Sequence, residues 1–62
     1  SEELKFLGLY DGNNDVISLE NVPFTEIQKI IKDRALQSPI TIIVKLENKE
    51  GQIVDFVLTK EK

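Results

Sequence analysis

The segment "PFTEIQKIIKDRA" (residues 23–35) decides the fold, because it predicts a helix in the middle of a chain whose other segments resemble strands. Its apolar residues recur at three- and four-residue spacing, which puts them on one face of a helix. That face consists of Phe24, Ile27, Ile30, Ile31 and Ala35. Thr25 and Gln28 have the spacing of a capping box, and Pro39 is predicted to end the helix.

Four segments around this helix have the composition or the alternation of β-strands, two before it and two after it. They are residues 4–10, 16–22, 40–46 and 53–59. Turn-forming residues separate the members of each pair: "DGNND" (residues 11–15) and "NKEG" (residues 48–51). The sequence therefore predicts an α+β domain of order ββαββ, with a mainly antiparallel four-stranded sheet and one helix packed on one face.

The length and composition indicate a single small domain, residues 1–62. A chain this short buries roughly 60% of the surface that its unfolded state exposes, so disulfides, a bound metal or oligomerisation commonly add stability. The chain has no Cys and no His, which excludes disulfides and ordinary zinc sites. Its net charge is -3, and residues 1–28 carry six acidic residues against a single base, Lys5, which argues against a broad phosphate-binding surface.

The turn "DGNND" contains a pattern that resembles a metal site. Asp11, Asn13 and Asp15 match the first three ligand positions of a calcium-binding loop. Val16 and Val22 stand where such a loop requires a glycine and a bidentate glutamate. Asp, Asn and Gly are also typical of hairpin turns, so we interpret the segment as a turn and expect no metal.

Catalytic residues and cofactors are not expected either. Without His or Cys, the serine and threonine hydroxyls lack the bases that usually activate them. Asp55 is a carboxylate inside an apolar strand, and alternation places it in water, on the face opposite Val54 and Phe56. The glycines are scattered and form no phosphate-binding loop. We therefore expect that this domain is not an enzyme.

Apolar residues exceed what one helix can cover, and this excess is the strongest functional signal in the sequence. The residues expected to face the helix are Ile17, Leu19, Ile40, Ile42, Val44, Leu46, Val54, Phe56 and Leu58. The other face still carries Val16, Ile43, Ile53 and Val57. The first strand is apolar on both sides, with Leu4, Phe6 and Tyr10 on one and Leu7 and Leu9 on the other. These extra residues are either scattered harmlessly over the surface or form an interface.

An interface that includes Leu7, Leu9, Ile43 and Val57 is the hypothesis that follows from this excess. It would bind a protein partner of unknown identity or a second copy of the chain, and we expect a homodimer because pairing also hides strand edges. No apolar run approaches the roughly 20 residues of a membrane span, so no membrane contact is expected. The predicted function is that of a small cytoplasmic protein-binding module, such as an inhibitor, adaptor or regulator. A composition rich in Lys, Ile, Asn and Glu would suit a phage or mobile-element origin.

The alternative is a regulator that binds single-stranded nucleic acid. Such proteins stack bases on exposed aromatic rings beside a basic groove. Tyr10 is the candidate ring and Lys29 and Lys32 are candidate phosphate contacts, whereas Phe24 and Phe56 are expected in the core. One tyrosine and scattered lysines in an acidic chain make this the weaker hypothesis.

Overall fold

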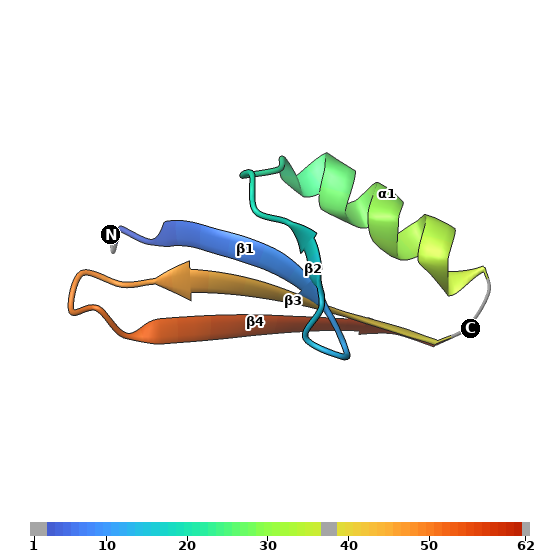
Figure 1. Cartoon of the computed structure of the whole chain (residues 1–62). Helices are drawn as coiled ribbons and strands as arrows, with labels where there is room; N and C mark the ends of the chain where they lie inside the picture. Colours follow the sequence, from blue (N-terminus) through green and yellow to red (C-terminus); the bar gives the residue numbers. More distant parts are fainter. Residues whose placement is uncertain (1–2, 37–38, 62) are drawn as a thin grey trace.

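A four-stranded antiparallel sheet with one helix on one side forms the domain (Figure 1). The computed structural model describes residues 3–36 and 39–61. Its elements are β1 (Lys5–Asp11), β2 (Val16–Ser18), α1 (Phe24–Ala35), β3 (Ile40–Glu47) and β4 (Ile53–Lys60). The strand order is β2-β1-β3-β4, every neighbouring pair is antiparallel, and α1 packs against β3. The predicted α+β fold of order ββαββ is confirmed.

The core lies between α1 and the central strands β1 and β3. Leu9 and Ile42 are fully buried, and Ile27 from the helix packs on them. Partly buried apolar residues surround this centre: Phe6, Ile17, Val22, Ile30, Ile31, Ile40, Val44 and Leu58. So small a set of buried side chains gives the domain little hydrophobic stabilisation, because stabilisation scales with the apolar area removed from water.

The start of α1 differs from the predicted capping box. Pro23 is the N-cap residue, and its carbonyl accepts hydrogen bonds from the amides of Glu26 (2.9 Å) and Ile27 (3.2 Å). Thr25 therefore lies inside the first turn, and the cap has no side-chain hydrogen bond. The predicted apolar stripe is confirmed for Ile27 and its neighbours toward Ala35.

Phe24 is the residue of that stripe for which core burial was wrongly predicted. Its side chain is 65% exposed. Helical side chains tilt toward the N-terminus, so the ring of the first helical residue projects past the end of the helix.

The second strand is shorter than its alternation predicts. β2 ends at Ser18, whose hydroxyl donates to the carbonyl of Glu20 (3.0 Å) and accepts from the Glu20 amide (3.1 Å). Local side-chain hydrogen bonds of this kind compete with a strand ladder. Leu19 consequently leaves the sheet and is 65% exposed, so the prediction that it faces the helix is wrong.

A β-bulge in β1 changes which of its side chains face the helix. Phe6 pairs with Leu46 and Gly8 with Lys45, so Leu7 is an extra residue between two consecutive pairs. Phe6 and Leu9 both pack in the core as a result. The predicted division of this strand, with Phe6 and Leu9 on opposite sides, is therefore wrong.

The two hairpin turns share one hydrogen-bond pattern. In the first, Asp11 Oδ1 accepts from the amides of Asn13 and Asp15 (both 2.9 Å), and Asn14 has a φ of 65°. In the second, Asn48 Oδ1 accepts from the amides of residues 50 and 52 (both 2.9 Å), and Gly51 has a φ of 79°. Each is a turn closed by a left-handed residue, the geometry of three-residue hairpin loops.

Replacing Gly51 with alanine is expected to lower the free energy of unfolding by roughly 1 kcal/mol, because a Cβ is unfavourable at its positive φ. Glu50→Ala in the same exposed turn is the control and should change stability by less than about 0.5 kcal/mol. Urea unfolding of both variants measures the difference. Equal stability of the two variants would contradict the left-handed assignment.

Candidate functional site

The side of the sheet away from α1 carries a line of apolar residues across all four strands. Tyr10 pairs with Val16 on β2 and with Ile43 on β3, and Ile43 pairs with Val57 on β4. Directly paired residues share a face, and the neighbours of Ile43 in β3 pack in the core, so these four side chains lie on the uncovered side. We call this side the open face and these four residues the apolar row.

The apolar row is accessible, most of all at its two ends. Val16 is 55% exposed and Val57 is 58% exposed, whereas Tyr10 and Ile43 are half-buried between neighbouring strands. Ile53, 57% exposed, lies on the same face farther along β4. The predicted placement of Val16, Ile43, Ile53 and Val57 opposite the helix is confirmed.

Tyr10 is held in place by two neighbours on the open face. A Cβ at Gly8 would lie 2.7 Å from Tyr10 Cε1, so the ring occupies the space that a side chain at residue 8 would need. Lys45 Nζ lies over the ring, 5.3 Å from its centroid, in cation–π geometry. A fixed aromatic ring loses little conformational entropy on binding, which suits an interface position.

Lys45 also pairs with Asp55 next to the apolar row. Their Nζ and Oδ2 atoms lie 3.4 Å apart across β3 and β4, and the two side chains are 24% and 42% exposed. The predicted placement of Asp55 in water, opposite Val54 and Phe56, is confirmed. An exposed pair of this kind contributes at most about 1 kcal/mol, and it leaves the flank of the row without excess charge.

The predicted interface residues do not form one surface. Ile43 and Val57 pair directly on the open face. Leu9 is 0% exposed in the core, so its predicted place in an interface is wrong. Leu7 lies at the bulge and is half-buried. The bulge explains why Leu9 was misplaced and why Tyr10 was not predicted to lie beside Ile43. The sequence signal that could have indicated the bulge is Gly8, a glycine inside a strand.

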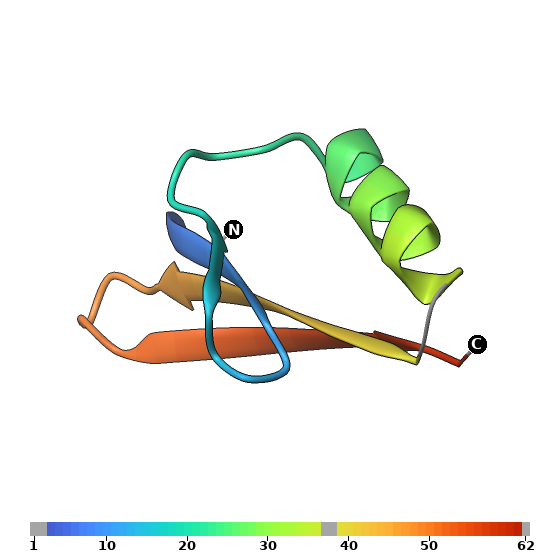
Figure 2. The same cartoon turned by 45° about the vertical axis from the view of Figure 1, so that its right-hand side comes forward.

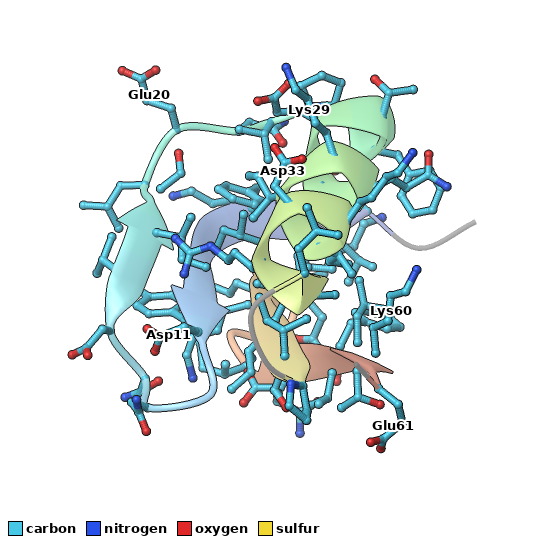
Figure 3. All side chains as sticks on the ribbon, turned by 90° about the vertical axis from the view of Figure 1, so that its right-hand side faces the viewer. Asp11, Glu20, Lys29, Asp33, Lys60 and Glu61 are labelled. Atoms are coloured by element: carbon cyan, nitrogen blue, oxygen red, sulfur yellow. The ribbon has the colours of Figure 1, made fainter. Side chains whose placement is uncertain are left out.

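The predicted nucleic-acid contacts lie on two sides of the molecule. Tyr10 is on the open face, whereas Lys29 and Lys32 are exposed residues of α1, on the other side of the sheet; Figure 3 shows Lys29 on the outer side of the helix. A base stacked on the Tyr10 face beneath Lys45 would have to displace that lysine.

Phe56, predicted in the core, lies on the helix side of the sheet but is 50% exposed. The reason is that α1 packs on β3 (Figure 2), so it covers the neighbouring edge strand β4, which contains Phe56, less well.

Asp11, one of the two acidic residues of the turn "DGNND", has a structural role. Asp11 Oδ1 accepts two backbone hydrogen bonds that close the loop, as described above. Among the described residues, no group of three or more acidic side chains is placed to hold a metal ion. The hydrogen bonds to Asp11 Oδ1 and the positive φ of Asn14 confirm that the segment is a turn.

Millimolar calcium is expected to leave the melting temperature unchanged within error. A ligand that binds only the folded state raises the melting temperature, and the turn lacks the glycine and glutamate of a calcium loop. Thermal unfolding with calcium and with chelator measures this. A rise of several degrees that Asp15→Asn removes would contradict the expectation.

A shallow, open depression lies where β1 begins and β3 ends. Its volume is about 450 Å³, and it is lined by Glu3, Leu4, Lys5, Glu47, Asn48 and Lys49. Ligand sites of this size are mostly enclosed and apolar with a few converging polar groups. Here acidic and basic side chains alternate on an open surface, which does not match that description.

Comparisons with known proteins give no match: no protein-family model, curated protein or solved structure is significantly similar to this chain. None of the helices among residues 3–36 and 39–61 has the length and apolar composition needed to span a membrane.

Proposed function

We propose that this domain is a cytoplasmic, non-enzymatic binding protein that acts by covering the surface of another protein with its open face. The apolar row carries the proposal. Four apolar side chains in register across a whole sheet form one continuous strip, and exposed apolar strips commonly mark interfaces. Inhibitors, adaptors and regulators all act by such coverage.

The surroundings of the row favour a protein over a nucleic acid. Lys45 is neutralised by Asp55, and Lys5 stands opposite Glu47 in the β1–β3 register on the same face, so positive and negative residues are matched there. Binding to phosphates depends on uncompensated positive charge, which this balanced face does not offer. An apolar centre with a balanced polar rim is the usual composition of a protein interface.

Partner capture with a tagged chain from the source cells tests the proposal. Val16→Glu puts a charge at the exposed end of the row and is expected to remove the captured partner. Leu36→Glu is the matched control, because Leu36 is an apolar residue of similar size at the end of α1 and is 76% exposed. It should retain the partner, and quantitative mass spectrometry compares the two captures with the wild type.

Two results would contradict the proposal. One is equal capture by Val16→Glu and the wild type. The other is single-stranded DNA binding well below about 10 μM at physiological salt, lost in Tyr10→Ala, which would favour the nucleic-acid hypothesis instead.

A further inference from the structure

β4 is a long edge strand with one free side. It spans eight residues and pairs with β3 along its whole length, from Ile40–Lys60 to Glu47–Ile53, without a register shift. The other edge of the sheet, β2, has three residues. An edge strand presents a row of unpaired backbone groups to which another strand can add.

The pairing with β3 determines which backbone groups are free. The Asn48 amide donates to the Gln52 carbonyl (3.0 Å), so these two residues form a hydrogen-bonded pair at the end of the ladder. Bonded and non-bonded pairs alternate in an antiparallel ladder. Alternation therefore directs the even-numbered residues 54–60 toward β3 and leaves the amides and carbonyls of Ile53, Asp55, Val57 and Thr59 at the free edge.

β4 lacks two of the features that usually protect an edge, although it carries the charged residues Asp55 and Lys60. It contains no proline, and its ladder with β3 contains no bulge. Ile53, Phe56 and Val57 are each at least half exposed, so both faces of the strand offer apolar surface. A long, regular edge with these side chains invites strand addition.

We infer that β4 pairs antiparallel with β4 of a second copy, with Val57 on the two-fold axis. In this register Asp55 lies opposite Thr59 of the second copy, and Val54 lies opposite its Lys60, so no like charges are opposed. Phe56 lies beside Leu58 of the second copy, which covers part of its exposed ring.

This register also joins the two apolar rows. Val57 of one copy lies opposite Val57 of the other, so the two copies form one eight-stranded sheet and the apolar row continues across both open faces. The inference extends the proposed function, since the joined rows would form the partner-binding surface, but the edge pairing can be tested separately.

The assembly ends at two copies. After β4 is paired, each outer edge consists of β2, which has three residues, and of the first residues of β1, which β2 does not reach and which the bulge at Leu7 interrupts. Neither stretch gives much regular length for further pairing. A two-fold contact of a strand with itself closes on one partner instead of extending into a filament.

Sedimentation velocity at about 100 μM tests the pairing, since a Kd of roughly 10 μM would leave most chains dimeric at that concentration. The wild type is expected at twice the 7.1 kDa chain mass. Val57→Pro removes a free-edge amide and should be folded and monomeric. Val16→Glu should remain dimeric, because Val16 lies on β2 at the far edge. A monomeric wild type, or a folded Val57→Pro that stays dimeric, overturns the inference.

Cysteine cross-linking tests the register without depending on the proline variant. The chain has no cysteine, so Val57→Cys introduces a single thiol. A hydrogen-bonded pair on the axis places its Cα atoms about 5.5 Å apart, within the range for a disulfide. Val16→Cys is the matched control, because the two valines are 58% and 55% exposed. Mild oxidation should form a covalent dimer much faster with Val57→Cys, and equal rates would overturn the register.

Discussion

Leu9→Lys is expected to unfold the domain. Leu9 is 0% exposed and packs with Ile27 and Ile42 at the centre of the core. Removing a buried leucine side chain costs about 2–5 kcal/mol, and burying an unpaired ammonium adds several more. A domain of this length has a total stability of roughly 3–5 kcal/mol, so the substitution should exceed it.

Circular dichroism and a proton–nitrogen correlation spectrum measure this outcome. The variant should lose the cooperative thermal transition and the dispersed amide signals of the wild type. Leu36→Lys is the control, because Leu36 is 76% exposed, and it should change the free energy of unfolding by less than about 0.5 kcal/mol. A folded Leu9→Lys that differs from the wild type only in self-association would place Leu9 on the surface and contradict the bulge in β1.

Phe56→Pro is expected to destabilise the domain far more than Val57→Pro. Phe56 pairs with Val44, and ladder alternation directs its amide toward β3, whereas the amide of Val57 points to the free edge. Proline at residue 56 removes a ladder hydrogen bond and leaves an acceptor in β3 unpaired, which costs roughly 1–3 kcal/mol in addition to the lost ring contacts. Proline at residue 57 removes an amide for which alternation leaves no ladder partner among residues 3–36 and 39–61.

Urea unfolding separates the backbone effect from the side-chain effect. Phe56→Ala supplies the cost of the lost ring, and the difference between Phe56→Pro and Phe56→Ala is the cost to the ladder. That difference should exceed the whole effect of Val57→Pro, measured at a concentration where the wild type is monomeric. Equal costs at the two positions would show that the assigned alternation along β4 is wrong.

The fold was predictable because periodicity and turn residues repeat over whole segments. The stripe from Ile27 to Ala35 and the paired hairpins determine the order of elements. The orientation of each side chain in β3 and β4 was also predictable. Their ladder has no register shift, so even-numbered residues face one side of the sheet and odd-numbered residues the other along both strands. Ile43 and Val57 were placed correctly for that reason.

The errors arise where a local interaction overrides the alternation of a strand or the expected start of the helix. One extra residue at Leu7 reverses the alternation of β1, so it moved Leu9 into the core and Tyr10 onto the open face. The hydroxyl of Ser18 ends β2 before Leu19 by bonding to the backbone of Glu20. Pro23, and not Thr25, caps the helix. Counting apolar spacing does not detect these local interactions; of the three, only the bulge has a sequence signal, the glycine at residue 8.

Residue-resolved amide hydrogen exchange along β4, at about 1 μM and about 1 mM, tests most directly that the uncovered side and edge of this sheet are its binding surface. The amides of Val54, Phe56 and Leu58 should be protected at both concentrations, because they pair with β3. The amides of Asp55, Val57 and Thr59 should exchange rapidly at the lower concentration and slowly at the higher one, as β4 of a second copy covers them. Rapid exchange of these three amides at both concentrations would contradict the pairing, and protection at both in a chain that sediments as a monomer would contradict the free edge itself.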